Sequence, residues 1–182
     1  ANAVELCGAK AIPADIDPER MSLSVQSVTA RATDRTVGVV PVHPFGIPAP
    51  MPELSSLARE RGGWMVEDAA CALGTETNGR WSQGVHPVCL SFHPRKTVTT
   101  GEGGAVGVND PALACRLREL RNHGIAADGI ERGWSRFTSI GFNYRMTDLA
   151  AAIGVVQLER LDDFVGLRRQ VVAWYREHLA AV

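Results

Sequence analysis

Lysine is nearly absent from this sequence, and so are long apolar runs and basic blocks. Only Lys10 and Lys96 are lysines, whereas seventeen residues are arginines. No apolar run approaches the roughly 18 residues that a membrane-spanning helix needs. The formal net charge is −1, and no basic cluster favours nucleic acid or an anionic membrane as a partner. The composition therefore gives no reason to expect a nucleic acid or a membrane as a partner.

Cysteine and histidine are also too scattered to form the common metal sites. The four cysteines, Cys7, Cys71, Cys89 and Cys115, include no CxxC pair, and the five histidines show no HExxH spacing. A disulfide framework is not expected in a chain of this size. The simplest interpretation is a cytoplasmic protein with four reduced thiols and no metal site.

The hydrophobic pattern predicts one layered α/β domain. At 182 residues, of which 45% are hydrophobic, the chain is long enough to bury a sizeable core. Short apolar runs alternate with segments of helical length, and 36–42 is apolar on both faces, as in a buried parallel strand. We expect strands over 11–14, 36–42, 64–67, 88–92 and 105–108, and helices over 25–32, 52–61, 111–122, 147–161 and 162–179. The segments 69–84, with a turn at Asn78-Gly79, and 123–139 are expected to be loops.

Lys96 lies in a polar, glycine-rich segment, 91–104, between two of the expected strands. An arginine does not readily lose its proton, whereas a lysine becomes an amine nucleophile once its environment lowers its pKa. One of the only two lysines therefore occupies a turn that a ligand can approach closely. For a lone lysine the alternative is an exposed loop residue with no chemical role.

Two further residues belong to the same expected sheet edge. Asp68 directly follows an apolar run, and ligands of open α/β sheets bind beyond the carboxyl ends of strands. Ser91 precedes Lys96 and carries a hydroxyl suited to a phosphate. A carboxylate for a pyridinium nitrogen and a lysine for a Schiff base are the groups that pyridoxal phosphate most needs. Taken by itself, Asp68 is better interpreted as a capping or turn aspartate.

Several motifs in this order resemble the sugar aminotransferases of the DegT/DnrJ/EryC1/StrS family. They are Gly8-Ala9 to Asp15-Ile16-Asp17, Glu67-Asp68-Ala69-Ala70, Ser91-Phe92-His93-Pro94-Arg95-Lys96, Thr99 to Val106, Arg121-Asn122-His123-Gly124, and Gly141 to Asp148 with the alanines that follow. The resemblance covers nearly the whole chain. It implies a type I, aspartate-aminotransferase-like fold: a mostly parallel sheet flanked by helices, assembled as a homodimer with its active sites at the dimer interface.

The resemblance also implies roles for individual residues. Lys96 matches the Schiff-base lysine, Asp68 the partner of the pyridine nitrogen, and Ser91 a phosphate ligand. Asn143 matches an asparagine that reaches the cofactor phosphate of the neighbouring subunit. Cys71 stands where relatives commonly have Gln or His against the side of the cofactor ring, and a thiol is a weaker hydrogen-bond donor.

The implied activity is transfer of an amino group, with glutamate as the expected donor, to a nucleotide-linked keto-sugar by a ping-pong mechanism with pyridoxal 5′-phosphate. Relatives are longer at both ends, so we expect residues 1–161 to be part of the cofactor-binding large domain and 162–182 a helix leading to a small domain. Two alternatives stay open. One is a pyridoxamine-phosphate-dependent sugar dehydratase, whose relatives replace the lysine by histidine. The other is a catalytically incomplete or regulatory member of the family.

Overall fold

The computed structural model describes residues 1–77, 80–81, 85–131 and 134–180. Its helices are α1 (Asn2–Leu6), α2 (Val25–Arg31), the 3-10 turn η1 (Pro44–Gly46), α3 (Met51–Glu60), α4 (Pro111–Leu120), α5 (Asp148–Glu159) and α6 (Leu161–His178). Its strands are β1 (Ile16–Asp17), β2 (Ser22–Leu23), β3 (Gly38–Val39), β4 (Trp64–Met65), β5 (Glu67–Asp68), β6 (Glu76–Thr77), β7 (Arg80–Trp81), β8 (Val88–Ser91), β9 (Gly104–Gly107), β10 (Ile125–Glu131) and β11 (Trp134–Phe137). Within the described ranges, no helix combines the length and apolar character needed to cross a membrane.

The central strands are short and carry the site. β3 pairs with β4 and β5 pairs with β8, both in parallel, and a parallel bridge joins Val42 to Asp68. β9 then pairs with β8 antiparallel. The expectation of a mostly parallel sheet therefore holds for these inner pairs and not for β9 or for the antiparallel hairpins β1–β2, β6–β7 and β10–β11. A hairpin reverses direction within a few residues, so its strands are antiparallel by construction.

The expected helices form, and a side chain caps the first turn of α2, α4 and α5. The Ser24 side chain accepts a hydrogen bond from Ser27 N, and the Thr147 side chain accepts one from Ala150 N. At α4 the Asp110 side chain accepts from Ala112 N, and Pro111 occupies the first turn. These side chains satisfy donors that a helix start leaves unpaired.

Three expectations in the first half of the chain need correction. No strand forms over 11–14, where Pro13 removes a ladder donor and Ala11 N instead donates to Glu5 Oε1. The expected strand over 36–42 is reduced to Gly38–Val39, with Pro41 interrupting the ladder before Val42. The segment 69–84, expected to be a loop, contains the strands β6 and β7, while its Asn78-Gly79 turn lies outside the described residues.

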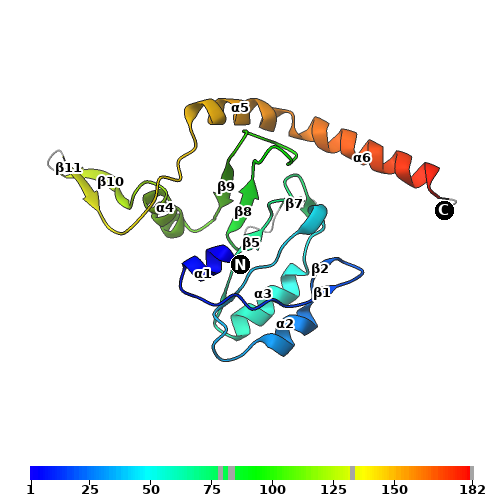
Figure 1. Cartoon of the computed structure of the whole chain (residues 1–182), viewed down its shortest axis with the longest axis horizontal. Coiled ribbons are helices and arrows are strands. Elements are labelled where there is room, and N and C mark those ends of the chain that lie inside the picture. The colour runs from blue at the N-terminus through cyan, green and yellow to red at the C-terminus, as the bar shows by residue number, and fades with distance from the viewer. Residues whose placement is uncertain (78–79, 82–84, 132–133, 181–182) are drawn as a thin grey trace.

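The segment 123–139 is also not a loop, because β10 and β11 form an antiparallel hairpin there. The two strands change register between Ile125 and Ile130. The exposed residues of β11 do not alternate between apolar and polar, so their pattern does not predict a strand. Ala126 of β10 is buried and Ile125 is partly buried, whereas Trp134–Phe137 of β11 are exposed, and the hairpin extends away from the sheet (Figure 1).

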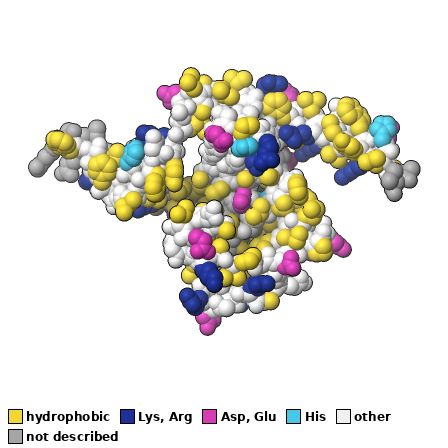
Figure 2. Space-filling model, in the orientation of Figure 1, with side chains coloured by type: hydrophobic (Ala, Val, Ile, Leu, Met, Phe, Trp, Pro, Cys, Tyr) yellow, Lys and Arg dark blue, Asp and Glu magenta, His cyan; other side chains and the backbone are white. Residues whose placement is uncertain are grey.

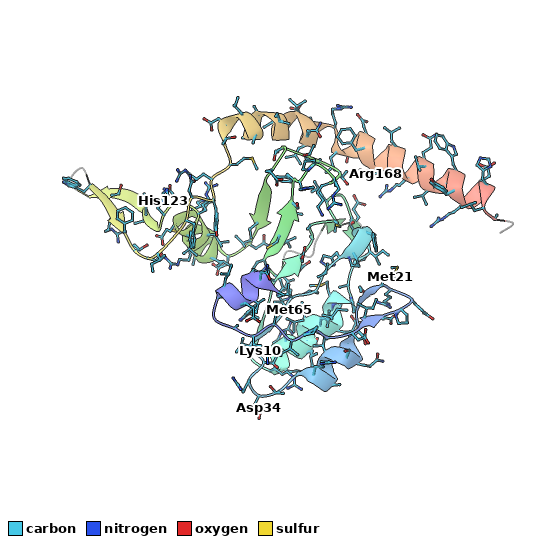
Figure 3. All side chains as sticks on the ribbon, in the orientation of Figure 1. Lys10, Met21, Asp34, Met65, His123 and Arg168 are labelled. Carbon is cyan, nitrogen blue, oxygen red and sulfur yellow. The ribbon has the colours of Figure 1, made fainter. Side chains whose placement is uncertain are left out.

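The main core lies between α2, α3 and the strands next to them. Leu54 and Met65 are its most deeply buried large side chains, and Val28, Ala49 and Ala58 complete it. Figure 3 places Met65 where α3 faces the sheet. A smaller cluster of Ala69, Ala72 and Val88 lies under the strands β5 and β8. Burying a side chain such as Leu54 contributes about 1.5–3 kcal/mol, so this cluster stabilises the packing of α3 against β4.

The second half of the chain spreads outward from this core. In Figure 1 the rod formed by α5 and α6 runs across the top of the molecule, beyond the ends of β8 and β9. Figure 2 shows hydrophobic side chains along this rod. Leu149, Ile153 and Val156 of α5 are 83%, 51% and 55% exposed. Helix α5 is apolar around most of its circumference, and such helices are usually covered on more than one side.

Candidate functional site

Asp68 lies at the carboxyl end of β5, where the pattern of apolar residues places it. Its backbone is fixed on both sides, because His43 N donates to Asp68 O at 3.0 Å and Asp68 N donates to Pro41 O at 2.9 Å. The register pairs Asp68 with Cys89 of β8. One carboxylate oxygen, Oδ1, accepts a hydrogen bond from Ala70 N at 3.1 Å. The carboxylate is therefore held at the sheet edge by the strands themselves.

The negative charge of Asp68 affects the pKa of Cys89, its neighbour on β8. Burial raises the pKa of the Cys89 thiol above its ordinary value, and the nearby Asp68 carboxylate raises it further. Both effects disfavour the thiolate, the first by desolvation and the second by like-charge repulsion. Cys89 is consequently a poor nucleophile at this sheet edge.

The lysine segment is a loop that closes on Phe92. Phe92 N donates to Gly103 O at 2.9 Å, and both Thr100 N and Thr99 Oγ1 donate to Phe92 O. Val98 and Thr100 are buried within the loop. These bonds tie the start of the loop to its end, so Lys96 projects from a fixed base.

The glycines of this segment serve close packing. Gly101 has a φ of +82°, which a residue with a side chain rarely adopts. A Cβ at Gly103 would lie 2.5 Å from Thr100 Oγ1, and one at Gly104 would lie 2.7 Å from Leu90 O. Contacts this short have no room for a methyl group. In this structure the glycine run therefore shapes the lysine loop.

Lys96 faces a cavity of about 500 Å³. The lining residues are Cys71, Ser91, His93, Arg95, Lys96 and Glu102. Of the residues expected at the site, Lys96, Ser91 and Cys71 thus meet around one space. His93, Arg95 and Glu102 were not among the expected site residues. His93 and Arg95 lie in the same sequence motif as Lys96, so that motif could have identified them as site residues. Glu102 lines the cavity because the loop closes on Phe92.

Lys96 and Cys71 are in direct contact. Lys96 Nζ donates a hydrogen bond to Cys71 Sγ over 3.1 Å, although the residues are 25 positions apart. Cys71 is exposed, and Lys96 is partly buried. Ser91 Oγ accepts a hydrogen bond from His93 N at 3.4 Å, which orients the hydroxyl toward the start of the lysine loop. An amine, a thiol and a hydroxyl therefore line the same cavity.

Asn143 lies elsewhere, in the segment that leads to α5. Its backbone forms an antiparallel bridge with Asn122, and its Oδ1 accepts a hydrogen bond from Arg145 N at 3.4 Å. Arg145 Nη1 donates to Asn122 Oδ1 at 2.6 Å. Two motifs that are well separated in the sequence, 121–124 and 141–148, are thus joined. Asn143 does not line the cavity that holds Lys96.

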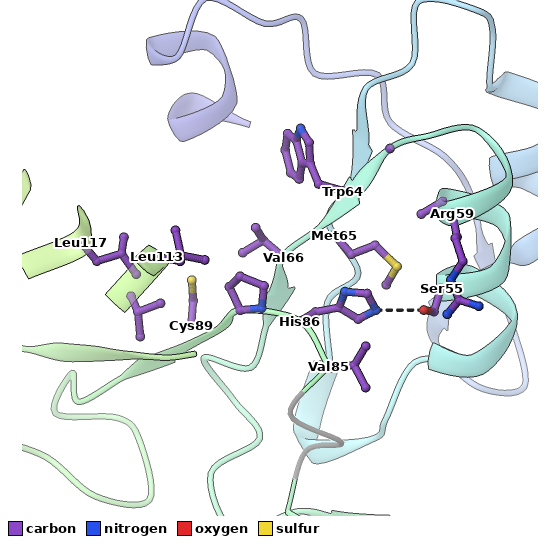
Figure 4. Close-up of a pocket in the computed structure, with 14 residues that line it drawn as sticks. Ser55, Arg59, Trp64, Met65, Val66, Val85, His86, Cys89, Leu113 and Leu117 are labelled. Carbon is purple, nitrogen blue, oxygen red and sulfur yellow. Dashed lines mark hydrogen bonds between the residues drawn. The ribbon is translucent and has the colours of Figure 1, made fainter. Parts of the chain in front are cut away.

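A larger, mostly apolar cavity of about 610 Å³ lies beside α3 and includes residues of β4, β8, β9 and α4 (Figure 4). Ser55, Arg59 and His86 are its main polar side chains, and His86 Nε2 lies 2.9 Å from Ser55 Oγ. None of the residues expected to bind a cofactor lines it. Volume alone would favour this cavity as the binding site. The amine, thiol and hydroxyl side chains instead favour the smaller cavity around Lys96.

Known proteins resemble this chain over nearly its whole length. GDP-perosamine synthase of Caulobacter vibrioides is 40% identical over 99% of this chain and 48% of its own length. A crystal structure of DesI with its TDP-sugar product is 37% identical, with a TM-score of 0.87 over 98% of this chain and 44% of that one. DesV of S. venezuelae, in complex with a ketimine intermediate, is 36% identical, with a TM-score of 0.89 over 98% of this chain and 47% of that one.

These similarities define an α/β protein with the type I fold of the sugar aminotransferases. The profile of the DegT/DnrJ/EryC1/StrS aminotransferase family matches residues 1–182, and the chain belongs to that family. The family prediction from the sequence motifs is confirmed. The chain spans about half the length of the relatives it matches.

Proposed function

We propose that this chain is the lysine-bearing part of a pyridoxal-phosphate-dependent sugar aminotransferase. The observation that carries the proposal is the cavity around Lys96, which Cys71, Ser91, His93 and Arg95 also line. Asp68 is not a lining residue, but its strand β5 pairs with β8, the strand that carries Ser91. Amine transfer requires a lysine amine, a phosphate site and a carboxylate for the pyridine ring. The chain offers each of these groups.

The donor set of the cavity fits the cofactor. Arg95 and the hydroxyl of Ser91 supply a cationic and a neutral hydrogen-bond donor, which suit a phosphate. Lys96 Nζ lies within the cavity lining, so an aldehyde held there is within its reach. Pyridoxal phosphate, when bound, supplies an electron sink for the carbon that loses its proton. We assign Lys96 to hold it, Ser91 to bind its phosphate, Asp68 to keep its ring nitrogen protonated, and Cys71 to contact the ring side.

The chain's own groups perform the proton transfers in this proposal. Lys96 Nζ, once released, is the general base that removes the proton from the amino donor, and it returns that proton on the other side of the reaction. Cys71 Sγ accepts a hydrogen bond from the same Nζ and so orients the amine within the cavity. The lysine loop, fixed through Phe92 and Thr100, keeps Nζ in position between the two steps.

The substrate class is proposed from the relatives. Those relatives include a GDP-perosamine synthase and a DesI structure with a TDP-sugar product. We infer a nucleotide-linked keto-sugar as acceptor and glutamate as donor, used in a ping-pong sequence in which one site serves both. A cytoplasmic location and use of the amino-sugar in polysaccharide biosynthesis follow from the same inference.

The proposed assembly is a homodimer with shared active sites. Asn143 lies outside the lysine cavity of its own subunit, and α5 exposes Leu149, Ile153 and Val156. A second copy that covers α5 would bury these side chains and bring a segment such as 141–148 toward the neighbouring cavity. We also propose that residues 1–161 belong to the large domain and that 162–182, which contains α6, lead to a further domain.

Amine transfer by the purified protein tests this function. With pyridoxal phosphate, glutamate and a GDP- or TDP-linked keto-sugar, we expect amino-sugar and 2-oxoglutarate in equal amounts. Loss of a hydroxyl from the sugar without amine incorporation would favour a dehydratase instead. Cofactor binding with neither product would favour a catalytically incomplete or regulatory member of the family.

A further inference from the structure

We propose that Cys71 and Lys96 form a reversible covalent crosslink, a sulfenamide, when hydrogen peroxide oxidises the thiol. The observation is the 3.1 Å contact between Lys96 Nζ and Cys71 Sγ. The two residues lie in different loops, one after β5 and the other after β8, yet the fold holds the amine against the sulfur. The proposal needs only these two side chains and peroxide, and does not depend on a bound cofactor.

Cys71 is placed for oxidation better than its neighbour on β8. Cys71 is exposed and lines the open cavity, so a small oxidant reaches the sulfur directly. Cys89 is partly buried, and burial together with Asp68 raises the pKa of its thiol, which disfavours the reactive thiolate. Cys7 is exposed as well and provides an internal comparison. Susceptibility to peroxide follows exposure and thiolate character.

The chemistry balances in two steps. First, the Cys71 thiol and hydrogen peroxide give a sulfenic acid and water, so the sulfur is oxidised and the peroxide O–O bond is reduced. The Lys96 amine then attacks that sulfur, an S–N bond forms, and the hydroxyl leaves with a proton from the amine as a second water. Sulfenic acids are known to condense with nitrogen nucleophiles, and an added thiol reverses the product by reducing the S–N bond.

The crosslink would remove the primary amine of Lys96. If Lys96 has the role proposed above, an oxidised protein cannot hold its cofactor, and a reductant restores it. In that case the cofactor and peroxide compete for the same nitrogen, because an amine already bonded to the cofactor cannot attack Cys71. The competition links the redox state of Cys71 to the occupancy of the site.

Peptide mapping of the cofactor-free protein tests the crosslink. Cleavage at arginine and lysine yields a peptide 62–80 with Cys71, and an unmodified Lys96 is cleaved from residues 97–116. After mild peroxide treatment in slightly alkaline buffer, we expect 62–80 joined to 96–116, because a modified lysine resists cleavage. Dithiothreitol should restore both separate peptides.

Four variants assign the bond. Cys71→Ser and Lys96→Arg should lose the joined peptide, whereas Cys7→Ser and Lys10→Arg should keep it. The proposal is wrong if wild-type Cys71 proceeds to sulfinic acid, or pairs with another cysteine, while Lys96 remains fully cleavable. This result is read from the wild-type protein, so it does not depend on how well a variant folds.

A parallel sample receives pyridoxal phosphate before peroxide. Protection of Lys96 from crosslinking is expected if it holds the cofactor. Equal crosslinking with and without pyridoxal phosphate would leave the sulfenamide established and count against the proposed role of Lys96. A wrong crosslink proposal and a wrong cofactor role for Lys96 would therefore give different experimental results.

Discussion

His43 Nε2 lies 3.1 Å from Glu67 Oε2, and both side chains are buried. His43 Nδ1 accepts a hydrogen bond from Ala49 N at 3.0 Å, so Nε2 carries the proton that is donated to Glu67. His43 N also donates to Asp68 O. The pair therefore fastens the loop after β3 to the strand that presents Asp68. Glu67 belongs to the motif 67–70, but its pairing with His43 was not predicted from the sequence.

Replacing Glu67 tests this fastening. Glu67→Leu leaves the Nε2–H of His43 buried without an acceptor, which costs about 1–3 kcal/mol of unfolding free energy. Glu67→Gln keeps an acceptor oxygen at the same place, and its loss should be clearly smaller. Urea denaturation followed by circular dichroism gives both values. Equal losses in the two variants would mean that the hydrogen bond does not matter here.

Gly124 joins the motif 121–124 to the segment before α5. It has a φ of +74°, and a Cβ there would clash with Ser139 O. Gly124→Ala should cost about 2–5 kcal/mol from left-handed strain and overpacking together. Gly166 in α6 has open space where a Cβ would lie, so Gly166→Ala should stabilise the protein by about 0.5–1 kcal/mol. Thermal and urea unfolding of the two variants should therefore shift in opposite directions.

The influence of Asp68 on Cys89 can be measured without cofactor. Asp68→Asn removes the negative charge and should lower the pKa of the Cys89 thiol, which stays above its ordinary value because burial is the larger cause. The alkylation rate of Cys89 at a fixed, mildly alkaline pH should therefore rise. Glu102→Gln, which removes a carboxylate that lines the lysine cavity, is the matched control. An unchanged rate in Asp68→Asn would contradict the electrostatic contact.

The same variant tests the proposed ring partner. Losing a charged hydrogen bond of about 1.5–3 kcal/mol corresponds to a rate decrease of about 10- to 150-fold in amine transfer. The measurement is the rate of 2-oxoglutarate formation with saturating glutamate and acceptor. A rate within twofold of the wild type would remove Asp68 from the mechanism.

Much of the fold was predictable from local signals. Ser24 and Thr147 cap the helices that follow them, and Asp68 falls at the end of β5 as its apolar run predicts. These features depend on neighbouring residues in the chain. The hairpin β10–β11 was missed because the exposed part of it has no alternating apolar face, so its pairing leaves little trace in the composition.

The candidate site was likewise predictable only where it depends on residues that are close together in the sequence. Lys96 and Ser91 belong to one motif, and their meeting in one cavity follows from a single loop. The contact of Lys96 with Cys71 and the pairing of His43 with Glu67 join distant segments, so only the fold reveals them. The role of Asn143 stays a prediction, since it concerns a second subunit.

The most direct test of the central claim uses the scarcity of lysine. Lys10 lies on the chain after α1, in the part of the molecule that carries α2 and α3 (Figure 3). The protein is incubated with pyridoxal phosphate, reduced with borohydride and mapped by mass spectrometry. We expect the pyridoxyl group on Lys96 in the wild type and in Lys10→Arg, and no specific label in Lys96→Ala. A label on Lys10 alone, or a reducible adduct that persists in Lys96→Ala, would contradict the assignment of Lys96.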